Sequence, residues 1–576
     1  MEYTGKSKDN EVIDNKDNGN DSSGSIIGIP LFAVTQNTTT TTTTQTTTPS
    51  INSSTVTTIT TNPCALVRHS CFLYVKEDKC QTHVTINKDA IPILAQQILE
   101  KQQQQQQQNV KAEHHLSNTA MLVEWDEEDW HYSCQSFSDI DTTPTTSWPP
   151  TIQIERMTMY ILALDAINFC FWRPPVVHNV RSTNNTLESS NQNESHHSNH
   201  HHYKYEYEDL AQTLTNMARS DHVQQQEQIH NTNNSNTTTS CLDTTTGTLS
   251  SSSPPLSPQL LSSEFLLSPM NLQNMTLERM NQLFQTFHPK NNTTTSTASA
   301  KNSESPLLVP PFMEERCRIW NEIGTVLMNP PFYGSILPLF QMVQEKYQQQ
   351  SLSSSPSSSK ASIMVQLLID YFPNFRDDTT KQYNNYISSQ PQESLSSSKS
   401  PPLLYFYKRA QICVGDLNAA LTSAKLQVDN DDTTTSTTTM NNDNMDEITT
   451  FADYRVPQLL RHSNIIQYST KLAQRIDTYE ELVQHSDEEY AIRASTIVAV
   501  ELLVQELRHQ QQQTFQLQEP KDDIDDTGIE TITTITGNSG VRWNAMQTDW
   551  YLWQLGEKME QKNELLPHHR VRTTFY

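Results

Sequence analysis

Apolar residues recur at helical spacing in several well-separated segments of the chain. Residues 88–100 place their apolar side chains on one helical face, and the glutamine run at 102–108 is expected to interrupt that helix. Residues 363–372 form a second such segment, which stops at Pro373. Because runs of alternating apolar and polar residues are few, the pattern predicts a mainly helical core with little strand.

Three further helices are predicted toward the end of the chain. Pro457 fits the first turn of a helix over 456–466, and residues 491–507 have a strong apolar face. The last helix carries an aromatic stripe at spacings of three, four and three positions, formed by Trp543, Met546, Trp550 and Trp553. Such a stripe is more typical of plain core packing than of a wall that stacks a ligand.

Polar repeats rich in Thr, Ser, Gln and Asn separate these segments. Residues 1–60 have nothing to bury and are expected to be a disordered tail. Residues 61–576 are expected to form one domain with expanded loops, because the entropic cost of closing a loop rises only slowly with its length. The expected loops lie at about 102–118, 182–202, 221–263, 289–305, 349–360, 388–402, 429–447 and 508–536.

Composition supports a smaller ordered core than the length of 576 residues suggests. Hydrophobic residues make up 34% of the chain, against about 45–50% in globular domains. The formal net charge is −26, which repels polyphosphate backbones and disfavours direct nucleic-acid binding. A few local cations could still hold one small phosphate.

The cysteines and the apolar segments indicate an intracellular protein. None of the eight cysteines belongs to a C-x-x-C pair, and the first residues lack the pattern of a signal peptide. The most apolar window, 157–172, contains Asp165 and is shorter than the ~18 residues of a membrane span. We therefore expect a monomeric protein of the cytoplasm, or of the nucleus, with no membrane partner.

Two pairs of polar residues stand out because they lie next to apolar runs, where charge is costly unless paired. Asp165 and Asn168 are three positions apart on one helical face, as expected for a buried pair that orients a hydrogen bond or for a satisfied core pair. Lys408 and Arg409 follow an aromatic stretch and suit a phosphate. The alternative for these cations is a salt bridge to Asp416 or Asp377.

Two other aspartates have both a functional and a structural interpretation. Asp453 precedes the predicted helix at Pro457 and could serve a site or simply cap the helix. Asp549 lies beside the tryptophan stripe and could face a pocket or solvent. The basic segment 567–576 ends on aromatic residues and either anchors to the core or helps to hold a phosphate.

Nine sequence motifs then occur in a fixed order along the chain. They are DAINFCFW (165–172), YEYEDLA (205–211), ERCRIWNEIGTVL (315–327), FPNFRD (372–377), FYKRAQ (406–411), FADYRVPQLLRH (451–462), EYAIRASTIVAVE (489–501), TDWYLW (548–553) and PHHR (567–570). Together they resemble the queuosine salvage family, the queuosine 5′-phosphate N-glycosylase/hydrolases. The resemblance covers nearly all of the non-repetitive sequence between 62 and 576.

The resemblance implies a fold like that of helix-hairpin-helix DNA glycosylases and the release of queuine from queuosine 5′-monophosphate, without metal or cofactor. It makes Asp549 the first candidate for the catalytic carboxylate and Asp453 the second, with Asp453 otherwise binding base or ribose. Lys408 would hold phosphate or ribose. The remaining implied substrate contacts are Tyr454, Arg455, Tyr551, Asp165, Asn168, His131, Asp377 and Arg409.

Two other functions remain open from the sequence. Another nucleotide or nucleoside N-glycosidase would use the same kind of pocket with a different base. A non-enzymatic interaction protein would instead use the Gln and Asn tracts to assemble partners.

Overall fold

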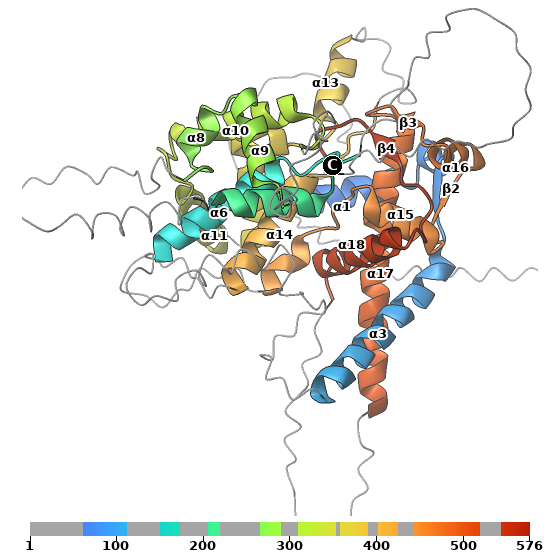
Figure 1. Ribbon diagram of the computed structural model, residues 1–576. Helices are drawn as coiled ribbons and strands as arrows, with labels where there is room; N and C mark the ends of the chain where they lie inside the picture. Colours follow the sequence, from blue (N-terminus) through green and yellow to red (C-terminus); the bar gives the residue numbers. More distant parts are fainter. Residues whose placement is uncertain are drawn as a thin grey trace, which may run out of the picture.

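A computed structural model describes residues 62–111, 150–172, 205–218, 220, 265–289, 309–352, 358–389, 401–423, 442–518 and 543–576. These segments form a mainly helical body, as the sequence predicts (Figure 1). The α-helices are α1 (Pro63–Tyr74), α2 (Asp78–Gln81), α3 (Ile91–Lys111), α6 (Pro150–Ala166), α8 (Pro269–Gln273), α9 (Leu277–Phe287), α10 (Met313–Met328), α11 (Pro338–Ser351), α12 (Lys360–Tyr371), α13 (Thr380–Ser389), α14 (Lys408–Ser423), α15 (Arg455–His462), α16 (Thr470–Asp477), α17 (Asp487–Gln518) and α18 (Ala545–Gln561). The short 3-10 helices are η1 (Lys88–Ala90), η3 (Pro373–Phe375) and η4 (Asn442–Glu447).

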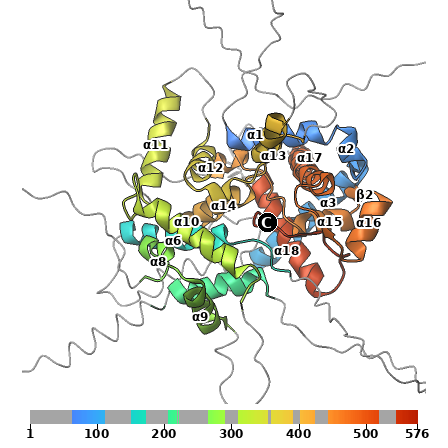
Figure 2. The ribbon, with the colours of Figure 1, turned by 90° about the horizontal axis from the view of Figure 1, so that it is seen from above.

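The helices lie in two groups (Figure 2), which contact one another where α1 packs on α12 and where Gly415 of α14 meets Met546 of α18. In one group α10 packs on α8 and α14 packs on α6, and in the other α18 packs on α15 while α17 packs against α1 and α3. Gly415 lets α14 approach α18, because a Cβ atom there would lie 2.9 Å from the sulfur of Met546. Side chains from both groups can therefore face one another at this junction.

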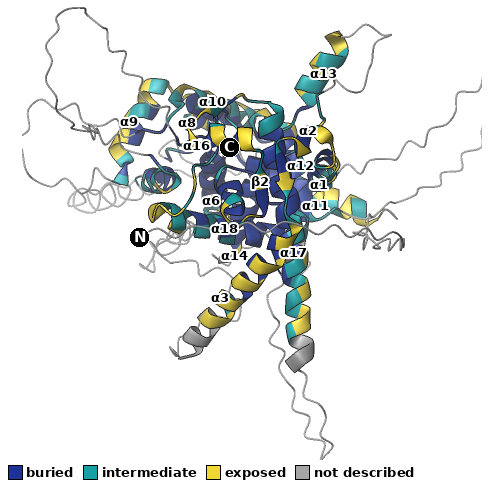
Figure 3. Ribbon diagram, turned by 90° about the vertical axis from the view of Figure 1, so that its right-hand side faces the viewer, coloured by how far each residue is buried: buried dark blue, intermediate teal, exposed yellow. Residues whose placement is uncertain are grey.

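Helix α6 runs through the core and is buried on all sides from Ile154 to Ala166 (Figure 3). From Met157 to Ala166 its residues are apolar on nearly all sides, with Thr158 and Asp165 as the polar exceptions, which is typical of a helix that has no solvent-facing side. Within the described ranges, no helix combines the length and the apolar character that crossing a membrane requires. The helix ends at Ala166, so Asn168 lies beyond it and does not share a helical face with Asp165, contrary to the sequence-based expectation.

Two pairs of short strands tie distant parts of the chain together. Strand β1 (Val84–Ile86) pairs antiparallel with β2 (Ile466–Tyr468), with Thr85 opposite Gln467. Strand β3 (Glu481–Leu482) pairs in parallel with β4 (Arg570–Val571). The second pair fixes the segment that follows α18 against the segment that precedes α17.

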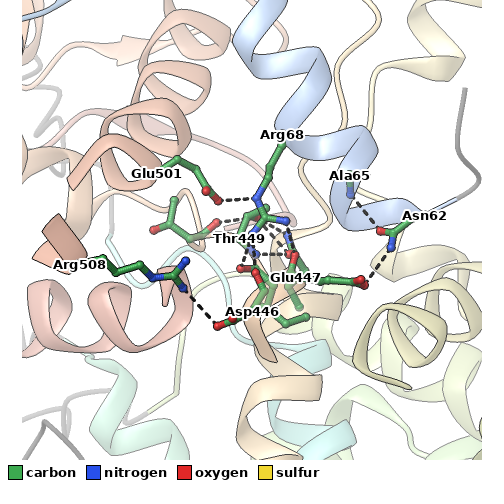
Figure 4. Close-up of polar contacts among 11 residues, drawn as sticks. Asn62, Ala65, Arg68, Asp446, Glu447, Thr449, Glu501 and Arg508 are labelled. Atoms are coloured by element: carbon green, nitrogen blue, oxygen red, sulfur yellow. Dashed lines mark hydrogen bonds and ion pairs between the residues drawn. The ribbon is translucent and has the colours of Figure 1, made fainter. Parts of the chain in front are cut away.

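A polar cluster joins α1 to η4 and α17 (Figure 4). Arg68 donates from Nε to Glu501 at 2.7 Å and from Nη1 to the carbonyl oxygen of Glu447 at 2.7 Å. Asn62 caps α1 and also donates to the Glu447 carboxylate at 2.9 Å. Arg508 of α17 donates to Asp446 at 3.3 Å. These contacts hold the beginning of the described chain on its last third.

Three helix boundaries differ from those predicted. The glutamines at 102–108 do not interrupt α3, because Gln is a good helix former and α17 packs along α3. Helix α17 likewise runs beyond 507 to Gln518, and the two helices extend from the body as a pair (Figure 1). The helix predicted over 456–466 is wrong at its end, since α15 stops at His462 and Asn464 adopts a left-handed conformation before β2.

Some of the expected loops contain ordered structure at their edges. Ser359 caps α12 and donates to Glu447 at 2.8 Å, so the segments 349–360 and 429–447 end in defined contacts. Residues 1–60, 182–202 and 221–263 lie outside the described residues.

Candidate active site

A cavity lies where α14, α15 and α18 meet the segments 168–172 and 205–208. Its polar lining is dominated by carboxylates, contributed by Glu206, Glu208, Asp416, Asp453, Asp549 and Glu557. Its cationic lining residues are Lys408 and Arg455. Much of the remaining wall consists of aromatic rings, which belong to Phe171, Trp172, Tyr205, Tyr207, Phe451, Tyr454, Trp550, Trp553, His568 and Tyr576.

Lys408 begins α14, is buried and lines the cavity. Tyr407 before it has a positive φ of 49°, which turns the aromatic lead-in sharply into the helix. Burial lowers the pKa of the Lys408 ammonium, whereas the nearby charge of Asp453 and the weaker effects of Asp165 and Asp549 oppose that fall. The lysine is thus a buried cation whose charge depends on the surrounding carboxylates.

Asp549 is buried on α18, whose start is fixed by a capping box between Asn544 and Gln547. Its Oδ1 accepts hydrogen bonds from the hydroxyl of Thr450 and from the backbone N–H of Phe451, the latter at 2.8 Å. Burial raises the pKa of the carboxyl to about 8, and the charge of Asp453 adds to the rise, while the two hydrogen bonds oppose it. The sequence-based alternative of a solvated aspartate does not hold, because Asp549 is only 3% exposed.

Asp453 is held by the N-terminus of α15. Its Oδ1 accepts from the backbone N–H groups of Arg455 at 2.9 Å and Val456 at 3.0 Å. Burial raises the pKa of this carboxyl, and Lys408 is the strongest of the groups that oppose the rise. One oxygen of Asp453 binds the start of α15 and the residue also lines the cavity, so the cap and the site interpretations are compatible.

Two more aspartates, Asp165 and Asp416, are near enough to Lys408 for its charge to affect their pKa values. Asp165 is fully buried at the end of α6 and does not line the cavity; burial raises the pKa of its carboxyl to about 8, opposed by Lys408. Asp416 does line the cavity, and burial together with the Asp165 charge raises its pKa. Sequence reasoning treated Asp416 only as a salt-bridge partner. Its position two helical turns after Lys408 was the signal that could have placed it in the site.

The aromatic wall includes residues that the sequence assigned to plain core. Trp543 and Met546 are indeed core residues, but Trp550 and Trp553 line the cavity. The ring of Trp553 lies edge-on to Tyr207, with centroids 5.8 Å apart. The last two tryptophans of the stripe therefore offer π-faces or edges to a ligand.

Some predicted site residues are not brought to the cavity. Asp377 accepts from Nη1 of Arg493 at 3.0 Å and from Nη2 at 2.5 Å, and it lies outside the lining. Arg409 donates to the carbonyl oxygens of Ala166 and Asn374. The family resemblance predicts both residues as substrate contacts. In the structure, Asp377 instead forms an ion pair within the core, and Arg409 binds main-chain carbonyl groups there.

Of four other predicted contacts, two line the cavity, one does not, and one lies outside the described residues. Asn168 and Tyr454 line the cavity, as expected of substrate contacts. Tyr551 does not line it, and its ring packs edge-on to Trp543 with centroids 6.0 Å apart. His131 lies outside the described residues.

Arg455 borders the cavity but is engaged by acidic residues of α18. Its Nε lies 2.6 Å from Oε1 of Glu557, and its Nη1 lies 3.2 Å from Oε2 of Glu560. Gly556 makes room for this side chain, because a Cβ atom there would lie 2.9 Å from the arginine Cδ. Arg455 therefore fastens α15 to α18 at the edge of the site.

Comparison with known proteins gives a consistent family assignment. The sequence model of a family described as queuosine salvage protein matches residues 266–576. A queuosine 5′-phosphate N-glycosylase/hydrolase of Dictyostelium discoideum is 32% identical over 266 residues, which cover 46% of this chain and 59% of the relative. The protein of the same name from Sphaerobacter thermophilus is 29% identical over 266 residues, covering 46% and 58% of the two chains. The chain thus spans less than two thirds of the length of these relatives. The family match includes the segments that carry Lys408, Asp416, Asp453 and Asp549.

Proposed function

Because the chain belongs to the queuosine salvage protein family, we propose that it hydrolyses the N-glycosidic bond of queuosine 5′-monophosphate and releases queuine for the salvage of tRNA queuosine. One observation carries the proposal. Asp549 and Asp453 both line the aromatic cavity, each with one carboxylate oxygen fixed by protein donors, around a buried lysine. Relatives that share this family bear the name of that activity.

The chemistry of the bond explains why carboxylates are needed. Breaking an N-glycosidic bond builds positive charge on the ribose, and a nearby carboxylate stabilises that charge or deprotonates the attacking water. Oδ1 of Asp549 is held by Thr450 and Phe451, so its orientation is set before the ligand arrives. We assign Asp549 as the carboxylate that faces the anomeric carbon or its water, and Asp453 as the group that binds base or ribose.

The leaving base places a second demand on the site. A 7-deazaguanine lacks the ring nitrogen that an acid would protonate, so hydrogen bonds to the base must take up the developing negative charge. Asn168 of the cavity wall can donate such a bond. The aminocyclopentenediol arm of the base is cationic at neutral pH, and the carboxylate-rich lining suits it. Trp550 and Trp553 supply surfaces on which the ring system can pack.

Lys408 is the proposed contact for the phosphate or the ribose. The positive charge of Lys408 opposes the rise that burial causes in the pKa values of Asp453, Asp165 and Asp549. Losing the lysine would therefore weaken both ligand binding and the charge of the groups around it.

Further properties accompany the proposed activity. We propose that the enzyme acts on the free nucleotide without metal or cofactor, as a monomer in the cytoplasm or nucleus. The net charge of −26 supports a small-molecule substrate rather than a nucleic acid. The mainly helical architecture is compatible with a fold like that of helix-hairpin-helix DNA glycosylases, which the family resemblance implies.

The test is a mass-spectrometric assay of the purified full chain with queuosine 5′-monophosphate. Wild type should release queuine, while Asp549→Ala and Asp453→Ala should lose at least about 100-fold in kcat/KM and remain folded by circular dichroism. Asp477→Ala is the matched control. Asp477 ends α16, is half-exposed, pairs with Arg461 of α15 and does not line the cavity. A folded wild type that releases no queuine would overturn the proposal.

The same assay separates the alternatives. Release of ordinary bases from other nucleotides, with no queuine formed, would establish a different N-glycosidase. An interaction protein would keep its function in Asp549→Ala and lose it when the Gln and Asn tracts are removed.

A further inference from the structure

His568 lies in the cavity wall, between two fixed points of the segment that follows α18. Before it, the carbonyl oxygen of Leu566 accepts a hydrogen bond from the side chain of Gln458 at 2.6 Å. After it, Arg570 begins β4, which pairs with β3. The imidazole is therefore presented to the cavity from a backbone that is held on both sides.

The ring orientation of His568 is set by two contacts. Its imidazole lies against the ring of Tyr454 with centroids 4.6 Å apart and an interplanar angle of 33°. Its Nδ1 lies 2.8 Å from the carbonyl oxygen of His569. A carbonyl oxygen only accepts hydrogen bonds, so Nδ1 must carry the proton.

The other ring nitrogen remains available. Among the residues that the structure describes, Nε2 of His568 has no hydrogen-bond partner, and it is not sealed from solvent as both ring nitrogens of His569 are. With the proton on Nδ1, Nε2 of the neutral ring holds a lone pair and acts as an acceptor.

The surroundings favour this neutral form. Burial lowers the pKa of His568 well below its ordinary value, and the positive charges of Arg455 and Arg570 and the ring of His569 add to the fall, although the hydrogen bond to the His569 carbonyl opposes it. The cavity-lining Glu557 of α18 and its neighbour Glu560 are engaged by Arg455. No local carboxylate contact therefore holds a proton on Nε2 in the described structure.

We infer that His568 is a specificity-determining residue whose Nε2 accepts a hydrogen bond from a neutral donor of the bound nucleoside, a ribose hydroxyl or an N–H of the base. It does not hold the phosphate, because an imidazole without charge and with a lone pair facing the cavity repels phosphate oxygens. The inference rests on the proposed function in taking the ligand to be a nucleotide. It assigns the basic-looking PHHR motif a role that its charge alone does not suggest.

The first experiment examines the ring itself and needs no substrate. The full chain is labelled with ¹⁵N-histidine, and the His568 signals are assigned by their loss in His568→Gln. The expected spectrum shows a neutral ring with Nδ1 protonated from pH 8 down to 5.5. A ring that titrates near the ordinary pKa of about 6.5, or that carries its proton on Nε2, would overturn the inference.

The second experiment measures dissociation constants by calorimetry in an Asp549→Asn background, where turnover is blocked. His568→Phe keeps an aromatic ring against Tyr454 and removes the acceptor, so it should weaken binding about tenfold. His568→Gln restores an acceptor oxygen and should recover most of that loss. Equal losses in the Phe and Gln variants would show a merely structural role and refute the inference.

Two ligand comparisons locate the donor. The Phe penalty should be the same for queuosine and its 5′-monophosphate; a penalty confined to the phosphorylated ligand would show phosphate binding instead. If the penalty disappears with a 2′- or 3′-deoxyribose analogue, the donor is that hydroxyl, and if it persists the donor belongs to the base. Wild type that neither binds nor cleaves either ligand refutes the proposed function, and the ring spectrum then still decides the state of His568.

Discussion

Two buried charged regions of this protein have similar compositions and opposite organisation. Asp377 and Arg493 form a closed pair, in which Nη1 and Nη2 of the guanidinium donate to the carboxylate and the cation lies over the rings of Phe406 and Tyr576. Lys408, Asp453 and Asp549 instead surround a cavity, and the carboxylates take their hydrogen bonds from neutral hydroxyl and backbone groups.

The difference distinguishes a charged pair that stabilises the fold from a charged group that can act on a ligand. In the Asp377–Arg493 pair, burial is compensated within the protein, and nothing remains for a ligand to add. Around Lys408, burial displaces the pKa values of the lysine and the aspartates from their ordinary ranges. A ligand that brings complementary charge can restore that balance, which is typical of active sites.

Breaking the closed pair should produce the largest change in stability. Asp377→Asn leaves the Arg493 guanidinium buried without its counter-charge, which should cost about 3–5 kcal/mol in the free energy of unfolding. Urea denaturation followed by circular dichroism measures this loss. The fraction that stays folded should keep the kcat/KM of wild type, and a selective loss of turnover in a fully folded variant would contradict the distinction between the two regions.

Changing the pH should alter kcat/KM by up to tenfold per pH unit, through the ionisation of Asp549 in the cavity. If the ionised form of Asp549 is the reactive one, kcat/KM should rise with pH until the apparent pKa near 8 is passed, because the acid form persists below it. The acid limb should remain in Asp165→Asn, since Asp165 has a similarly raised pKa but does not line the cavity. A flat profile from pH 6 to 9 would argue against Asp549 as the reacting carboxylate.

The smallest expected effect is a gain in stability. Burial raises the pKa of Asp549 above its unfolded value, so the folded state loses stability as pH rises from about 4 to about 8. Asp549→Asn removes that cost while its amide oxygen can still accept from Thr450 and Phe451. The variant should be more stable than wild type by on the order of 1 kcal/mol at pH 9 and show less gain at pH 5. Urea denaturation at both values measures this, and a variant destabilised equally at both would show that Asp549 is structural.

Much of the helical fold and part of the site could be predicted from local sequence. Asp549, Asp453 and Lys408 stood out because they are charged residues next to apolar and aromatic neighbours, and all three line the cavity. The pairing of Asp377 with Arg493 could not be seen, because the partners are 116 positions apart and nothing local indicates which arginine is the partner.

The errors have related physical causes. The end of α15 was misplaced because the left-handed turn at Asn464 is not encoded by a glycine or proline. Segments distant in sequence decide which residues of the aromatic stripe pack in the core and which line the cavity. Tyr207, for example, contacts Trp553 from more than 300 positions away. Periodicity identifies a buried face, but the elements that cover it decide whether the face touches protein or ligand.

The polar cluster that joins α1 to η4 and α17 has a consequence for synthesis of the chain on the ribosome. Arg68 finds Glu447 and Glu501 only after about 380 to 430 further residues have been made. At about 5–20 residues per second, this takes on the order of 20–90 s. During that interval the apolar α6 has been made while α14, which covers it in the finished protein, is still to come. The nascent chain is therefore expected to need chaperones that shield the early helices until its last third emerges.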